Sequence, residues 1–174
     1  PSATPEQLKA MVTDSAVPLL FLDADNAEAL AHISFSARTI RIEQIDDWLA
    51  DTPPAPLATP TDALLKQPFN IIYSSGTTGV PKGIVHSWSM RWSHLVGGAP
   101  AGYGPDSVCL LATPLYSNTT LVAALPCLAW GGHLVMMPKF DARRFLELAQ
   151  AYRATHSMLV PVQYRRIMDL PDFD

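Results

Sequence analysis

The chain has 174 residues and a formal net charge of −4 at pH 7, with 48% hydrophobic and 16% charged residues. A chain of this length buries roughly 70% of its unfolded surface and needs no disulfide or metal to fold. The acidic balance argues against nucleic-acid binding, and the hydrophobic content excludes a disordered chain. No apolar run approaches the ~20 residues of a membrane span, and residues 1–11 lack a signal-peptide core, so we expect a cytoplasmic location without a transmembrane segment.

The first 52 residues are predicted to form a small α/β part. Apolar residues run continuously over 17–22, as in a buried strand. The other elements expected here are helices over 5–12 and 26–32, a strand over 39–43 and a helical turn over 46–49. A linker, residues 53–68, follows, because its closely spaced prolines exclude a helix or a central strand.

Residues 69–174 are predicted to form a β-α-β-α-β-α part. The expected strands cover 69–73, 83–86, 108–113, 133–137 and 157–160, and the expected helices cover 88–96, 119–130, 141–152 and 161–168. This alternation is typical of an α/β fold, a layered and mostly parallel sheet with helices on both faces. Ligands bind outside the carboxyl ends of such strands, which makes 73–76, 113–118 and 160–163 the candidate binding loops.

Helical periodicity also predicts which side chains are buried. The helix over 88–96 is expected to bury Trp88, Trp92, Leu95 and Val96, and the helix that follows Asp141 is expected to bury Phe145, Leu148, Ala149 and Tyr152. Pro126 should kink the helix over 119–130. Cys109 and Cys127 lie in apolar stretches and are expected to be buried thiols, and the five histidines show no metal-ligand spacing.

The segment 73–83 combines glycines, hydroxyl side chains and one lysine between two apolar strands. Glycines let backbone N–H groups approach an anion, and a lysine supplies a compact positive charge. The candidate phosphate-binding residues are Ser74, Ser75, Gly76, Thr77, Thr78, Gly79 and Lys82. The spacing is not that of a Walker loop, because Pro81 stands where the second glycine belongs and Gly83 follows the lysine. Composition alone leaves a flexible hairpin loop as the alternative.

The run SSGTTGVPKG resembles the phosphate-loop signature of the adenylate-forming superfamily, which contains acyl- and aryl-CoA synthetases, peptide-synthetase adenylation domains and luciferases. The stretches 113–121 and 131–141, the Phe-Leu-Glu-Leu helix and the strand before Pro161 continue the likeness. The resemblance covers about residues 14–170 and is closest to the acyl-CoA synthetase branch. It implies that the fold is part of the large N-terminal domain of such an enzyme.

The resemblance implies a two-step reaction. ATP and a carboxylic acid give an acyl-adenylate and pyrophosphate, and coenzyme A then takes the acyl group. The loop residues named above would hold the β- and γ-phosphates, with Mg²⁺ bridging them. The acyl pocket would involve Tyr116, Ser117, Asn118 and Thr119. Ser117 stands where many relatives carry His, and a helix N-cap or turn is its alternative role; Trp130 stands where some CoA ligases carry a basic residue, so no CoA contact is assigned.

Several family motifs are not found in these 174 residues. They are the Tyr-Gly-x-Thr-Glu type motif that binds the metal, the later ribose-binding Asp and the catalytic Lys of a C-terminal domain. We therefore expect an internal fragment of an acyl-CoA synthetase that is inactive alone and self-associates through apolar faces. The alternatives are a stand-alone nucleotide- or phosphate-binding module without catalysis and an inert structural α/β domain.

Overall fold

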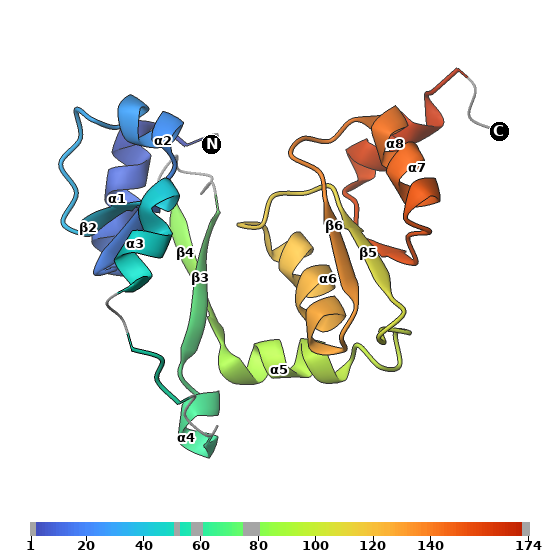
Figure 1. Cartoon of the computed structure of the whole chain (residues 1–174), viewed down its shortest axis with the longest axis horizontal. Helices are drawn as coiled ribbons and strands as arrows, with labels where there is room; N and C mark the ends of the chain where they lie inside the picture. The colour runs from blue at the N-terminus through green and yellow to red at the C-terminus, as the bar shows by residue number, and fades with distance from the viewer. Residues whose placement is uncertain (1–2, 51–52, 57–60, 75–80, 172–174) are drawn as a thin grey trace. The chain divides into compact units, whose positions relative to one another are not determined.

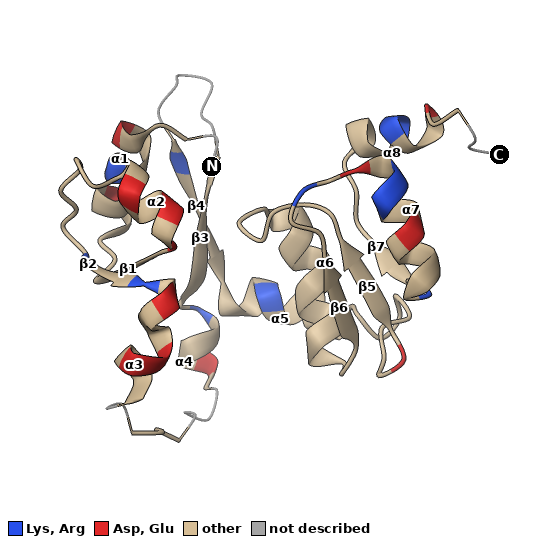
Figure 2. Cartoon of the chain, turned by 45° about the horizontal axis from the view of Figure 1, so that its top comes forward, with Lys and Arg blue, Asp and Glu red and all other residues tan. Residues whose placement is uncertain are grey.

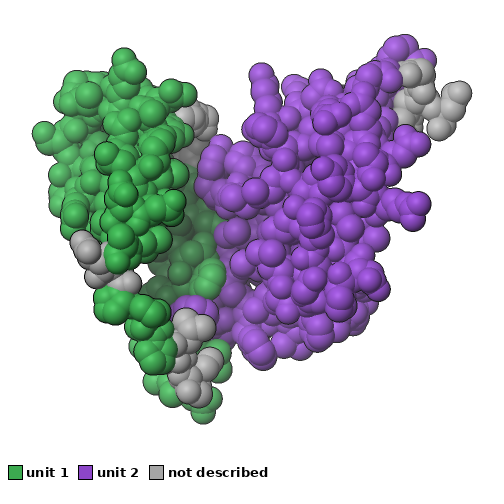
Figure 3. Space-filling model, viewed as in Figure 1, with its two compact units in different colours: residues 1–86 green, residues 87–174 purple. Residues whose placement is uncertain are grey.

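The computed structural model of the chain describes residues 3–50, 53–56, 61–74 and 81–171. The chain divides into two compact units, Pro1–His86 and Ser87–Asp174 (Figure 3). This boundary lies within a strand, after the proline-rich segment 53–68 in which the sequence suggested a division. Part of that segment lies outside the described residues, so the division at the linker stays a prediction.

Unit 1 contains two small sheets and the helices around them (Figure 1). Its elements are α1 (Pro5–Ser15), β1 (Leu19–Leu22), α2 (Ala24–Ala29), β2 (Arg38–Arg41), α3 (Ile45–Ala50), α4 (Asp62–Leu65), β3 (Pro68–Ser74) and β4 (Lys82–Ser87). Strands β1 and β2 pair in parallel, and β3 and β4 pair with each other. The expected elements are present with shifted ends, and α4 is an addition within the predicted linker.

Unit 2 is built on a three-stranded sheet. Its elements are α5 (Trp88–Val96), β5 (Val108–Leu111), α6 (Asn118–Ala129), β6 (His133–Met136), α7 (Ala142–Ala151), β7 (His156–Ser157) and α8 (Pro161–Met168). The strand order is β6-β5-β7, and β5 is parallel to both neighbours. These strands carry no charged residue, whereas α7 and α8 do (Figure 2). The predicted parallel α/β arrangement is confirmed in this unit.

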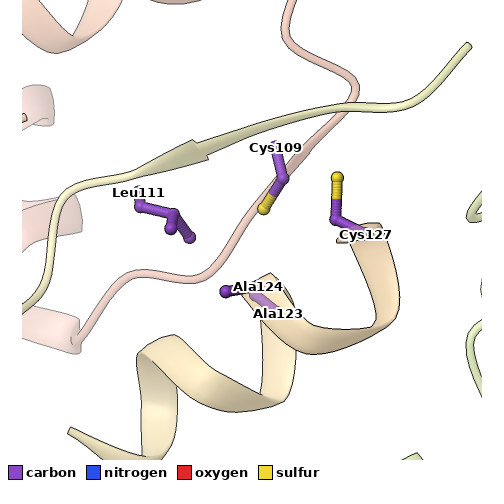
Figure 4. Packing of buried hydrophobic residues seen from close by; sticks show 5 residues of the cluster. All are labelled: Cys109, Leu111, Ala123, Ala124 and Cys127. Carbon is purple, nitrogen blue, oxygen red and sulfur yellow. The ribbon is translucent and has the colours of Figure 1, made fainter. Parts of the chain in front are cut away.

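Successive residues of β5 alternate between two apolar clusters. Cys109 and Leu111 pack with Ala123, Ala124 and Cys127 of α6 (Figure 4). Leu110 and Ala112, which alternate with Cys109 and Leu111 along the chain, belong to a second cluster. Its other buried members are Val135 of β6, Phe145 of α7 and Ile167 of α8. Because side chains of a strand alternate between faces, helices cover both faces of this sheet.

Both cysteines are fully buried free thiols, as the sequence predicted. Burial in this apolar layer raises the pKa of the Cys109 thiol to about 11, because the thiolate would lose its hydration. These thiols therefore act as small apolar side chains in the core.

The predicted buried face of α5 is wrong for three of its four residues, and the fourth, Leu95, is half-buried. Arg91 is the buried residue of this helix, at 2% exposure, whereas Trp88, Trp92 and Val96 are exposed. The reason is that the Arg91 guanidinium has a partner inside the unit: Nη1 donates to Asn118 Oδ1 at 2.9 Å. A bonded guanidinium can occupy a buried position that periodicity assigns to an apolar residue.

Two smaller expectations also fail in unit 2. Tyr152 follows the last residue of α7 and is exposed, with its ring stacked against His133 at 6.2 Å, whereas Phe145 is buried as predicted. Strand β7 ends at Ser157, short of the predicted residue 160. The Val160 N–H donates to the Gln163 side chain at 3.0 Å, so this residue begins the turn into α8. None of the described helices has the length and apolar character needed to cross a membrane.

Candidate functional site

The predicted phosphate loop connects β3 to β4. Ser74 is the last residue of β3, Lys82 is the first residue of β4, and both are exposed. Because the two strands are paired, the sheet holds both attachment points of the connecting segment. The other predicted phosphate-binding residues, Ser75, Gly76, Thr77, Thr78 and Gly79, lie outside the described residues. Their role stays a prediction.

The end of β3 is braced against α1 through Tyr73. Its hydroxyl donates to Asp14 Oδ2 at 2.6 Å and also lies 3.2 Å from the Met11 carbonyl oxygen. Partial burial, and then the hydrogen bond to Asp14, raise the pKa of Tyr73 above its ordinary value of 10.0. The residue directly before Ser74 is therefore fixed to a helix far away in the sequence.

Gly83 leaves room for the Tyr73 ring at the start of β4. A Cβ at position 83 would lie 3.1 Å from Ile71 Cγ2 and 3.2 Å from the Tyr73 ring. The ring cannot move freely, because its hydroxyl is bonded to α1. Gly83 thus belongs to the packing at the base of the loop, in addition to the conformational freedom that the sequence suggested.

The predicted acyl segment follows β5 and leads into α6. Tyr116 is 66% exposed, and Ser117, Asn118 and Thr119 are half-buried. Ser117 occupies the N-cap position of α6, but its hydroxyl makes no capping bond there, and its N–H donates to the Pro114 carbonyl at 2.9 Å. The turn alternative proposed for Ser117 therefore agrees with the backbone, and its relation to a substrate stays a prediction.

A cavity of about 410 Å³ lies at the carboxyl ends of β5 and β6. This volume is within the range of small-molecule binding pockets. In folds of this kind, ligands bind at the carboxyl ends of the strands, where this cavity lies. Its walls are mostly apolar and are formed by Leu111, Thr113, Pro114, Leu115, Met136, Met137 and Pro138. The four predicted pocket residues do not line it. Met136 and Met137 were not among those four residues, although they lie in the stretch 131–141 that carried part of the family likeness.

A second hollow lies between the C-terminal ends of α5 and α6. Its volume is about 480 Å³ and its walls are Trp92, Leu95, Val96, Ala99, Ala129 and Trp130. The Trp130 indole N–H donates to the Leu95 carbonyl at 2.7 Å. Trp130 therefore joins the two helices, and this lining offers no ionisable side chain for catalysis. Among the described residues, no three His, Cys, Asp or Glu side chains gather as metal ligands.

Comparison with known proteins identifies the family. The family model described as "AMP-binding enzyme" matches residues 1–174. The chain therefore belongs to the AMP-binding enzyme family, which confirms the resemblance stated from the phosphate-loop run.

Several curated relatives are acid–CoA ligases. The chain is 27% identical over 180 residues to 4-coumarate–CoA ligase 1 of Oryza sativa subsp. japonica, a match that covers 92% of this chain and 32% of that protein. It is 38% identical over 92 residues to the chloroplastic/peroxisomal 2-succinylbenzoate–CoA ligase of Arabidopsis thaliana, covering 52% of this chain and 16% of that protein. The chain thus spans about a third or less of the length of these relatives.

Solved structures give the same fold. ATP-bound MatB from Rhodopseudomonas palustris superposes with a TM-score of 0.77 at 28% identity, covering 98% of this chain and 35% of MatB. The N-terminal domain of FACL13 from Mycobacterium tuberculosis superposes with a TM-score of 0.80 at 22% identity, covering 98% of this chain and 44% of that one. The α/β fold of an adenylate-forming N-terminal domain is therefore confirmed.

The bond between Tyr73 and Asp14 predicts a pH-dependent stability. Tyr73→Phe should lower the free energy of unfolding at neutral pH by about 1 kcal/mol, because one hydrogen bond is lost. The pKa of Tyr73 is raised in the folded state, so the neutral phenol stabilises the fold fully below the unfolded pKa. This contribution is lost as the pH rises through the folded pKa. Urea unfolding at increasing pH should show the difference between wild type and variant narrowing in the alkaline range.

Tyr164→Phe is the control, because this tyrosine is exposed on α8. If the difference in free energy of unfolding between wild type and Tyr73→Phe stays constant from neutral to strongly alkaline pH, the hydrogen bond between Tyr73 and Asp14 does not contribute as described.

The space beside Tyr73 predicts a difference between two glycines. Gly83→Ala should destabilise the fold by about 1 kcal/mol, because the added methyl group crowds the Tyr73 ring. Gly104→Ala is the matched control, since a Cβ there meets nothing within 4 Å. Thermal unfolding of both variants measures the effect. Equal melting temperatures would show that Gly83 has no packing role.

Proposed function

We propose that this chain forms part of an AMP-forming acid–thiol ligase. The enzyme would activate a carboxylic acid with ATP as an acyl-adenylate, release pyrophosphate and transfer the acyl group to coenzyme A. The observation that carries the proposal is the SSGTTGVPKG run, whose first residue ends β3 and whose last two residues begin the paired strand β4, in a chain that belongs to the AMP-binding enzyme family. The chain spans a third or less of its relatives, so the reaction is proposed for the complete polypeptide that includes it.

The donors of the loop fit the phosphates of ATP. Ser74 and Lys82 bring a hydroxyl and an ammonium group to the two ends of the loop, and both residues are exposed at the surface. The residues between them add hydroxyls and glycine backbone N–H groups, which suit an anion. Bracing of Tyr73 against α1 supports this role, because binding costs less when the donors are already positioned.

Lys82 would act on charge that develops during adenylation. Negative charge moves onto pyrophosphate as it leaves, so a positioned cation and positioned donors stabilise the transition state more than the ground state. The loop would therefore assist the chemical step as well as bind ATP. This role requires no proton transfer by the lysine.

Mg²⁺ and coenzyme A belong to the proposal for the complete polypeptide. Mg²⁺ is commonly coordinated by one or two protein carboxylates together with substrate phosphates. The described residues bring no cluster of metal ligands together, so no step is assigned to the ion here. No residue is assigned to coenzyme A, because Trp130, which stands where some CoA ligases carry a basic residue, has no charge to offer and donates its indole N–H to the Leu95 carbonyl.

The acid would bind at the carboxyl ends of β5 and β6. The cavity there has apolar walls from Leu115, Met136 and Met137, which suit an uncharged hydrocarbon portion of the acid. The segment Tyr116 to Thr119 would border it, since it directly follows Leu115 in the chain. Removal of apolar acid surface from water would supply the binding free energy.

Two substitutions in the loop test the phosphate role. In the complete polypeptide, Lys82→Ala and Thr78→Ala should each slow acyl-adenylate formation by about 100- to 1,000-fold, the usual loss when one positioned donor is removed. Acid-dependent pyrophosphate release measures the rate. Lys9→Ala is the control, because Lys9 is an exposed lysine on α1. Full activity of both loop variants, at saturating and at limiting ATP, would contradict the proposal that this loop binds the phosphates. ATP binding by the wild type without any acid-dependent pyrophosphate release would favour a non-catalytic module.

A further inference from the structure

Three buried polar side chains from three helices of unit 2 contact one short segment, residues 112–118. They are Arg91 of α5, Thr120 of α6 and Gln163 of α8, which are 2%, 0% and 7% exposed. Burying such side chains costs free energy unless their polar atoms are hydrogen-bonded. Three of them around seven residues therefore mark a segment whose conformation is closely specified.

Gln163 joins two of the loops at the carboxyl edge of the sheet. Its Nε2 donates to the Ala112 carbonyl at 2.8 Å, and its Oε1 accepts from the Val160 N–H at 3.0 Å. One amide side chain thus fixes the end of β5 to the start of α8. Both the oxygen and the nitrogen of the amide are hydrogen-bonded within the protein. This group therefore has a structural role and does not bind a ligand.

Thr120 and Arg91 hold the rest of the segment. Thr120 Oγ1 lies 2.6 Å from Thr113 Oγ1 and donates to the Pro114 carbonyl at 2.6 Å. Arg91 Nη1 donates to Asn118 Oδ1 at 2.9 Å, at the first residue of α6. The segment is therefore tied to α5 at its far end and to α6 and α8 nearer the strand.

This segment forms one wall of the 410 Å³ cavity, through Thr113, Pro114 and Leu115. The residues that hold the wall are not among those that line the cavity. Their hydrogen bonds therefore fix the position of this wall, although the three side chains would not contact a ligand in the cavity. Small displacements of such a wall weaken the alignment of a bound reactant, and a shift of about 1 Å can cost about 100-fold in rate.

We propose that Arg91 and Gln163 are positioning residues for the acid substrate. They hold segment 112–118 at the distance from β6 that the acid requires, and so determine which acids fit. The inference rests on the proposed function for its kinetic consequence, but the packing it describes can be measured without activity. The hydrogen bonds involved all lie within unit 2, so their loss should affect the acid and leave ATP affinity unchanged.

Kinetics of the complete polypeptide give the first measurement. Arg91→Met and Gln163→Leu remove the bonds with little change in volume, and each should raise the KM for the acid by about tenfold or more while the KM for ATP stays within about twofold. Arg91→Lys keeps a donor and should recover part of the loss. Arg144→Met is the matched control, because this arginine is exposed on α7 and its guanidinium pairs with Glu147 of the same helix at 3.0 Å.

Hydrogen exchange gives the second measurement and needs no substrate. The Ser117 N–H is bonded to the Pro114 carbonyl at 2.9 Å, and the Leu121 N–H to the Ser117 carbonyl at 3.2 Å. Both amides should exchange faster in Arg91→Met than in wild type or Arg144→Met. If Arg91→Met fails to fold, Asn118→Ala removes the same bond from a half-buried position and provides the same comparison.

The outcomes separate the inference from the proposed function. Acid-dependent pyrophosphate release by wild type, with unchanged acid KM in Arg91→Met and Gln163→Leu, would overturn the positioning role and leave the ligase. A wild type that releases no pyrophosphate with any acid would overturn the ligase and with it the role toward the acid, and the exchange of the two amides would then decide only whether Arg91 holds segment 112–118. Unchanged exchange in Arg91→Met would show that it does not.

Discussion

The alternation of side chains along β5 is the constraint on which unit 2 depends. Cys109 and Leu111 face α6, whereas Leu110 and Ala112 face α7 and α8, so four consecutive residues build both cores. A charged or large polar residue at any of these positions would open one of the two layers. The same strand is hydrogen-bonded to β6 and β7, which fixes the edge at which its chain leaves the sheet.

Segment 112–118 leaves the sheet at that edge, and the acyl site is proposed there. Apolar packing determines where β5 ends, and buried hydrogen bonds from Arg91, Thr120 and Gln163 determine the course of the next seven residues. Hydrophobic burial supplies stability without direction, whereas these bonds specify one conformation. The proposed phosphate loop is built differently, because paired strands and the Tyr73 anchor hold its two ends in unit 1.

The order of elements could be predicted because apolar runs are separated by Gly and Pro, and α8 begins at Pro161 as expected. The burial of Arg91 could not, since periodicity counts apolar residues and carries no information about a partner 27 positions away. The acyl pocket was predicted at Tyr116 and its neighbours, but the cavity is lined by the residues just before them and by the end of β6. The phosphate-binding role of residues 75–79 and the expected self-association stay predictions.

The most direct measurement of the central claim is a crystal structure of the complete polypeptide with a non-hydrolysable ATP analogue. We predict that the β- and γ-phosphate oxygens lie within hydrogen-bonding distance of Lys82 Nζ and of backbone N–H groups of residues 74–82, beyond the braced end of β3. A triphosphate bound elsewhere, with Lys82 turned to solvent, would contradict the assignment of this loop as the ATP phosphate cradle.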